Sequence, residues 1–179
     1  MAQSDSLLIT LDDIKKIRPT AQLDNERVEP YISNAQMFDI RPLLGDPLYY
    51  DMLKKFDDND SADKEKYEKL LVGDDYTKGT DIYRFDGLKT ILVYHTLARF
   101  IPENPFHITR FGFVMKNTDQ STPVPTAEIT RVVNILKSNA TGLYFRLEEY
   151  LDIKKSDFPL WKPANQTTTK RSGFKISKL

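Results

Sequence analysis

The chain has 179 residues, with 26 basic and 26 acidic side chains and no cysteine. This length suffices for one core that buries roughly 70% of the extended-chain surface, so we expect one domain with appendages. The even charge gives no general reason to bind nucleic acid or an anionic membrane, and the lack of cysteine excludes disulfides and thiolate metal sites. The N-terminus shows no signal-peptide pattern, and no apolar run is long enough to cross a membrane. We therefore expect a soluble cytosolic product.

The first expected element is a short helix after Thr10, which can cap it. Asp12 and Asp13 suit the first turn of this helix because carboxylates are favourable near a helix N-terminus. Pro19 should end the helix and hold Arg18 in an extended conformation.

The stretch from residue 28 to residue 44 carries apolar residues in two stripes of helical spacing. One stripe consists of Val28, Tyr31, Ile32, Ala35 and Phe38, and the other of Met37, Ile40 and Leu44. Projected on a regular helix, the two stripes lie on nearly opposite sides. A helix that is apolar on two sides has to be covered on two sides, so we expect this helix to be the central one.

A corner is expected where this helix meets the next. Pro42 removes a backbone donor, so the helix should kink there or end just before it. Gly45 suits a positive φ, while Asp46 and Pro47 suit the N-cap and first position of the following helix. That second helix, residues 47–56, should point Leu48, Met52 and either Tyr49 or Phe56 inward.

Residues 57–63 are strongly acidic, but their spacing does not match a calcium-binding loop, so we interpret them as a solvated surface loop. A helix from Lys64 to Val72, closed by Gly73, and a polar loop with a short strand should follow. The next helix, about Tyr83 to Ile101, is apolar on nearly every side, which is typical of a buried helix. We interpret its His95 as a hydrogen-bonded core histidine, because two histidines without cysteine make a poor zinc site.

Residues 107–116 alternate as a strand does, with Thr109, Phe111, Phe113 and Met115 on one side. The longest helix should then run from Thr126, as its N-cap, to about Leu151. Ile135 and Phe145 lie off its apolar stripe. Two exposed apolar residues on one long helix are compatible with a neighbouring subunit, so both are candidates for a subunit interface.

The C-terminal segment is basic and has no helical period. Residues 154–179 contain seven basic side chains and one acidic side chain, so the rest of the chain carries a net charge of −6. We expect an extended arm whose apolar residues anchor it. Residues 158–161 either pack on the chain's own core or dock on a partner, and for residues 170–179 the partner is favoured. The candidate partner-binding residues of the arm are Phe158, Trp161, Lys170, Arg171, Phe174 and Ile176.

No catalytic or cofactor motif is present in the sequence. Asp39 is the one carboxylate that projects onto an apolar helix face, and Arg41, Arg84 or Arg99 could pair with it. We therefore expect no enzyme, no cofactor and no metal site. The fold class is mainly α: a helical bundle with a kinked central helix, one short β hairpin or strand pair, and an extended C-terminal arm.

Several stretches resemble the head–tail connector (adaptor or ring, neck) proteins of tailed bacteriophages, including those of crAss-like and related phages of Bacteroidetes hosts. The similar stretches are LLITLDDIKKI, PYISNAQMFDI, RPLLGDPLY, FDGLKTILVYHTLARFI, FGFVMKNTDQSTP and the helix ending LEEYL. The resemblance covers roughly residues 7–151. The basic arm lies outside it, and we divide the chain into a helical connector domain, residues 1–153, and a basic extended C-terminal arm, residues 154–179.

The resemblance implies a structural virion protein, many copies of which form a ring, typically dodecameric, between portal and tail. Such a ring binds the portal and other neck or tail proteins, and it extends the channel through which DNA passes without sequence-specific binding. It implies localisation in the virion neck after assembly in the host cytoplasm, with no membrane. We expect the isolated chain to be monomeric, and deletion of residues 158–179 to spare the fold but abolish docking.

The alternative is a nucleic-acid-binding module that acts through the basic arm. It would use Trp161 and Phe174 as stacking groups, together with Lys162, Lys170, Arg171, Lys175 and Lys178. This function requires DNA affinity that falls steeply with salt.

Overall fold

The computed structural model describes residues 6–19, 23–57, 63–104, 107–109, 112–114 and 125–163. The protein is mainly helical. The α-helices are α1 Leu11–Ile17, α2 Asn25–Ala35, α3 Arg41–Leu44, α4 Asp46–Asp57, α5 Lys64–Val72, α6 Leu88–Glu103 and α7 Thr126–Ile153. A π-helical segment, η1 Gln36–Ile40, joins α2 to α3, and the strands are β1 Asp74–Lys78, β2 Asp81–Phe85, β3 His107–Thr109 and β4 Gly112–Val114.

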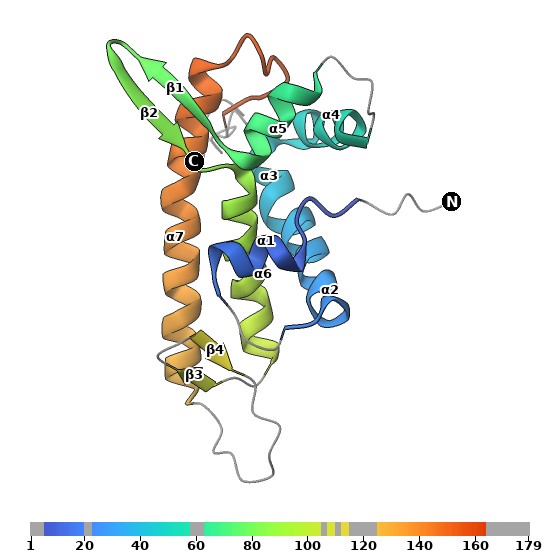
Figure 1. The fold of residues 1–179 in the computed structure, drawn as a ribbon, viewed down its shortest axis with the longest axis vertical. Helices are drawn as coiled ribbons and strands as arrows, with labels where there is room; N and C mark the ends of the chain where they lie inside the picture. Colours follow the sequence, from blue (N-terminus) through green and yellow to red (C-terminus); the bar gives the residue numbers. More distant parts are fainter. Residues whose placement is uncertain are drawn as a thin grey trace, which may run out of the picture.

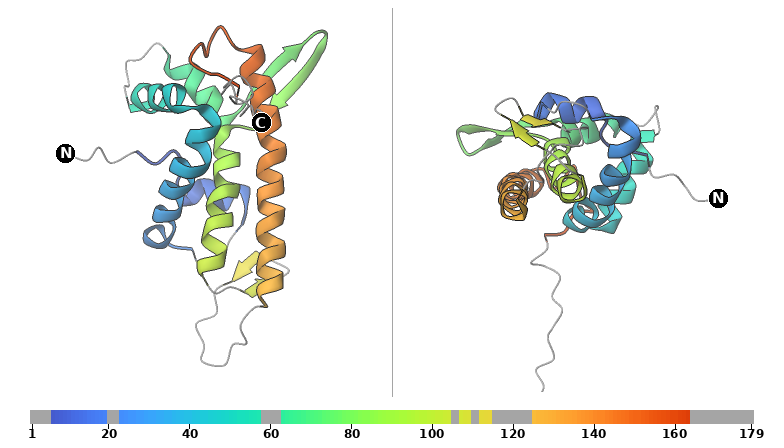
Figure 2. Two further views of the ribbon diagram at one scale, coloured as in Figure 1. Left: turned by 180° about the vertical axis from the view of Figure 1, so that it is seen from behind. Right: turned by 90° about the horizontal axis from the view of Figure 1, so that it is seen from below.

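Helix α6 lies at the centre of the fold. It stands between α7 on one side and α2 to α3 on the other, and α1 crosses it (Figures 1 and 2). Its buried residues face all of these neighbours: Leu88, Ile91, Leu92, Val93, Thr96, Leu97, Ala98, Phe100 and Ile101. The prediction of a buried helix here is confirmed, although it begins at Leu88, after Gly87, rather than near Tyr83.

The prediction that residues 28–44 form the central helix is wrong. Met37 and Phe38 are 41% and 59% exposed, so this run is covered on one side only. The π-helical segment explains the difference. It fits one extra residue into a turn, which rotates everything after it by about 100° and brings Ile40 and Leu44 onto the buried face that Ile32 already occupies.

The helix also continues through Pro42 to Leu44 instead of ending before it. Proline has no N–H to donate to the preceding turn, and the widened π turn immediately upstream accommodates this missing donor. The kink at this point stays a prediction.

The corner at Gly45 forms as predicted, with one shift in position. Gly45 has φ +77°, and α4 begins at Asp46 itself, so Gly45 rather than Asp46 stands before the first helical residue. The Arg41 guanidinium donates to both Asp46 carboxylate oxygens at 2.8 Å and thereby joins the two helices across the corner. Leu48 and Met52 of α4 are fully buried, as expected for the helix that follows the corner.

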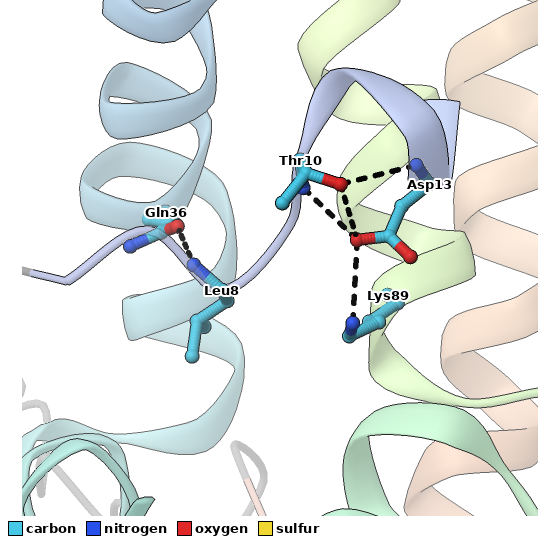
Figure 3. A network of polar contacts seen from close by, with 5 residues as sticks. All are labelled: Leu8, Thr10, Asp13, Gln36 and Lys89. Atoms are coloured by element: carbon cyan, nitrogen blue, oxygen red, sulfur yellow. Dashed lines mark hydrogen bonds and ion pairs between the residues drawn. The ribbon is translucent and has the colours of Figure 1, made fainter. Parts of the chain in front are cut away.

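The N-terminal segment is held by two polar contacts, seen in Figure 3. The Leu8 N–H donates to Oε1 of the buried Gln36 at 2.7 Å. Thr10 and Asp13 form the capping box of α1, and Lys89 of α6 lies 3.3 Å from the Asp13 carboxylate. The predicted cap and the extended Arg18 are confirmed, and the Lys89 contact ties α1 to the central helix.

Replacing Asp13 by asparagine should lower the free energy of unfolding by about 1 kcal/mol at neutral pH. Burial alone would raise the pKa of the Asp13 carboxyl, but the Thr10 N–H and the Lys89 charge outweigh it and hold the pKa below its ordinary value of 3.8. Because the folded-state pKa is the lower one, the stabilisation is present above pH 3.8 and is lost as pH falls through the folded-state pKa. Urea unfolding at neutral and acidic pH tests this, and an equal difference between variant and native protein at both would contradict it.

Two β-hairpins accompany the helices. In the first, β1 pairs antiparallel with β2 from Asp74↔Phe85 to Lys78↔Asp81, where a loop and one short strand had been predicted. In the second, β3 pairs with β4 across Thr109↔Gly112. The predicted single strand over residues 107–116 is wrong, because β3 and β4 within this range run antiparallel to each other.

Helix α7 confirms the predicted long amphipathic helix, with Val132, Leu136, Ala140, Leu147, Tyr150 and Leu151 buried. Pro125 rather than Thr126 occupies the N-cap, and Thr126 is the first helical residue. The first hairpin packs against the C-terminal end of α7, where Tyr150 stacks on Phe85 with 4.9 Å between the ring centroids. This stacking fixes the side of α7 on which the hairpin lies.

Candidate interaction surfaces

A groove of about 270 Å³ opens between the η1–α3 run, α6 and α7. We call it the groove surface. It is mostly apolar and is lined by Phe38, Asp39, Pro42, Leu43, His95, Ala140, Thr141 and Tyr144. The exposed Phe38 and the partly buried Tyr144 supply aromatic surface at its walls. Phe145 follows Tyr144 on α7, with 6.4 Å between the ring centroids, and is 64% exposed.

The polar part of the groove is an ion pair. The Arg99 Nε and Nη2 atoms donate to the Asp39 carboxylate at 2.6 and 2.9 Å. The Arg99 guanidinium also lies over the Phe38 ring, 5.4 Å from its centroid. Of the three arginines predicted as partners of Asp39, Arg99 is therefore the one that pairs. The contact couples η1 to α6 and places the guanidinium against the Phe38 ring.

His95 lies beside this pair, with its Nδ1 atom 3.8 Å from Asp39 Oδ2. Burial lowers the pKa of His95, while Asp39 opposes the shift and Arg99 adds to it. A histidine with a lowered pKa is neutral at physiological pH, and its ring can then donate one hydrogen bond and accept another within the groove. It lines the groove instead of the closed core in which it was expected.

Ile135 and Phe145 are exposed by 42% and 64%, so their predicted exposure on α7 is confirmed, and their role in an interface stays a prediction. Ten residues along an α-helix correspond to a rotation of about 80°, so the two side chains point to different sides of α7. Each is about 40° around α7 from Glu149, whose carboxylate accepts hydrogen bonds from Tyr76 and Lys78 of the first hairpin. Phe145 lies on the side of the groove-lining Thr141, and Ile135 lies on the side away from it.

The first hairpin forms a second exposed surface that the sequence reasoning missed. Ile82 on β2 is 77% exposed, the largest exposure among the large hydrophobic side chains of the described residues. We call its outward face, with Asp75, Thr77, Ile82 and Arg84, the hairpin surface. A signal was present in the sequence: the isolated Gly79 separates two short runs of β-favouring residues, which is typical of a hairpin.

The structure decides between the two alternatives for residues 158–161. Phe158 and Trp161 are 1% and 2% exposed and belong to the hydrophobic core, so the assignment of these two residues to a partner is corrected. Phe158 contacts the rings of Tyr67 and Tyr150. Trp161 is consequently no stacking group for bases, and deletion from residue 158 onward would remove core residues. Lys170, Arg171, Phe174 and Ile176 lie outside the described residues.

Within the described ranges, no three His, Cys, Asp or Glu side chains are grouped so that they could hold a metal ion. Most of the acidic loop, residues 58–62, lies outside those ranges. Across the same part of the chain, every helix is too short or too polar to traverse a lipid bilayer.

Comparison with known proteins adds a family. A search of the curated proteins and a search of the solved structures each found no match. A family model described as a family of unknown function, DUF6712, matches residues 40–171. The match includes the whole hairpin surface and all of the groove surface except Phe38 and Asp39. It continues beyond α7 through Phe158 and Trp161. The chain belongs to the DUF6712 family.

Proposed function

We propose that this protein is a structural subunit of a phage virion that forms a ring in the neck, between portal and tail. The observation that carries the proposal is that exposed apolar side chains occur on two different surfaces of one helical body. The groove surface is hollow and holds Phe38 and Tyr144, with Phe145 beside it. The hairpin surface projects from the body beside α7 (Figure 1) and presents Ile82. The proposal assigns the chain neither a catalytic role nor a cofactor.

Ring closure explains why two different surfaces are needed. In a cyclic assembly each subunit uses one surface toward the preceding copy and another toward the following copy, whereas a twofold dimer uses the same surface twice. Apolar side chains left exposed on two sides of a monomer fit the first arrangement. The net charge of −6 over residues 1–153 also suits a channel wall, because affinity for DNA comes from lysine and arginine contacts to phosphate.

Replacing Phe145 by glutamate should abolish assembly while leaving the monomer folded. Phe145 is 64% exposed, so a charge there costs little in the monomer but would be buried without a partner in an interface. Ile135→Glu tests the other side of α7 in the same way. Assembly is measured by mass photometry and negative-stain electron microscopy of the full chain, alone and mixed with the portal protein encoded by the same genome.

Leu160→Glu is the matched control, because Leu160 is 41% exposed and belongs to neither surface. Native-like assembly of both the Phe145 and the Ile135 variants would remove these residues from the interface. The ring itself is tested by the position of the gene and by cryo-electron microscopy of the particle neck. A gene distant from portal and terminase genes, or a neck that lacks this subunit, would overturn the proposed function.

A further inference from the structure

The outer edge of β2 is an unused hydrogen-bonding edge. The β1–β2 sheet has two strands, so within the described residues neither outer edge is paired with a third strand. Four of the five residues of β2 are exposed, and Phe85 alone is buried. Exposed strand edges are sites at which another chain segment adds as a strand, and natural proteins usually cover or block them.

The register shows which groups this edge offers. The two-residue turn Gly79–Thr80 joins Lys78 to Asp81, so Lys78 and Asp81 form a hydrogen-bonded pair. From there along the two strands, non-hydrogen-bonded and hydrogen-bonded pairs alternate. Ile82 and Arg84 fall in the non-hydrogen-bonded pairs. Their backbone N–H and C=O groups therefore point away from β1, and their side chains lie on the hairpin surface. An added strand would meet two backbone donors, two acceptors and the exposed Ile82 side chain.

The charge of the hairpin restricts what can dock there. Residues 74–86 carry four aspartates against one lysine and one arginine. Arg84 pairs with Asp75, and Lys78 with Glu149 of α7, so both hairpin cations are already engaged. The remaining acidic groups favour a basic segment.

The chain itself contains such a segment. Residues 173–179, Gly-Phe-Lys-Ile-Ser-Lys-Leu, alternate so that Phe174 and Ile176 fall on one side of an extended chain and Lys175 on the other. With Phe174 and Ile176 beside Ile82, Lys175 would lie on the opposite face, which is the face of Asp81. No acidic side chain occurs among residues 164–179.

We propose that residues 173–179 of one copy add as a third strand to the exposed edge of β2 in a neighbouring copy. The nine residues 164–172 would span at most about 30 Å, enough to pass from one subunit to the next. The choice of a neighbouring copy as the source rests on the proposed ring. Each subunit then gives one strand and receives one, and the contact adds backbone hydrogen bonds to the apolar contacts of the two surfaces.

The absence of cysteine makes this contact directly testable. Full-length chains carrying Ile82→Cys and Ile176→Cys, one of them tagged for size, are mixed with and without the portal protein and oxidised. We expect a disulfide-linked heterodimer. The matched control is Thr77→Cys mixed with Ile176→Cys. Thr77 is exposed and pairs with Ile82 in the register, but a strand added beside β2 would lie about 10 Å from it, beyond the reach of a disulfide.

The outcomes separate this contact from the ring. Assembly of the mixed chains without the Ile82–Ile176 disulfide, or equal disulfide formation at Thr77, overturns the strand contact and leaves the ring standing. A disulfide in a species that never grows beyond a dimer supports the strand contact and overturns the ring. A chain that carries both cysteines and links them only within itself, with no heterodimer in the mixture, shows that the segment covers its own hairpin and overturns the exchange between copies.

Discussion

Replacing Trp161 by alanine is expected to lower the free energy of unfolding by about 3–5 kcal/mol, a large part of the stability of a single domain. Trp161 is 2% exposed and lies in the hydrophobic core although it follows the last helix by several residues. Its removal leaves a cavity that the surrounding side chains cannot fill. Phe158→Ala should cost a similar amount because Phe158 contacts Tyr67 and Tyr150. Urea unfolding followed by circular dichroism measures both.

Two controls make this result specific. Within the described residues Trp161 Nε1 is buried without a hydrogen-bond partner, so Trp161→Phe keeps an aromatic ring without sacrificing such a bond and should cost less than Trp161→Ala. Truncation after Pro163 should leave the unfolding midpoint nearly unchanged, whereas truncation after Asp157 should lower it strongly. If both truncations unfold like the native chain, the segment from Phe158 to Trp161 does not contribute to the core.

Gly87→Ala is the second substitution for which we expect a large loss, about 3 kcal/mol or more. Gly87 has φ +85°, and a Cβ atom there would lie 2.5 Å from the Val72 carbonyl group. Gly73, at φ +117°, meets the backbone of Phe85 equally closely. Because both residues lack a Cβ atom, the backbone segment that enters the first hairpin and the one that leaves it can lie in close contact. Backbone atoms on both sides leave no flexible side chain that could move aside.

Gly79→Ala is the matched control in the same hairpin. Gly79 also has a positive φ, +66°, but nothing lies within 4 Å of a Cβ atom placed there. The alanine should therefore cost only the conformational strain of about 1–2 kcal/mol. Thermal unfolding of the two variants and the native protein gives the comparison. Equal losses for Gly79→Ala and Gly87→Ala would show that the close backbone approach at the base of the hairpin is unimportant.

Both expectations bear on assembly. Gly73 and Gly87 position the hairpin surface, and Phe158 and Trp161 anchor the chain from which residues 164–179 continue. A variant that weakens either site should lose ring formation together with stability. Phe145→Glu and Ile82→Cys, by contrast, are expected to leave unfolding unchanged, so a loss of assembly in Phe145→Glu can be attributed to the surface itself.

Helical spacing and turn chemistry in the sequence were sufficient for most individual helices. The helix cap at Thr10, the glycine after Val72 and the apolar stripe of α7 each depend on residues within a few positions of one another. The exposure of Ile135 and Phe145 followed from the same periodicity. Asp39 was identified as a carboxylate needing a partner, but three arginines fitted equally well, because their distances depend on how separate helices pack.

Three features could be recognised only in the tertiary structure. The π-helical turn rotates the helix after residue 35, so a regular helical projection placed Ile40 and Leu44 on the wrong side. The first hairpin consists of exposed, charged strands whose pairing depends on contact of Tyr76 and Phe85 with Tyr150, more than sixty residues away. Phe158 and Trp161 suit a core or a partner equally well in the sequence, because hydrophobic burial has no direction and the same side chain leaves water in either place.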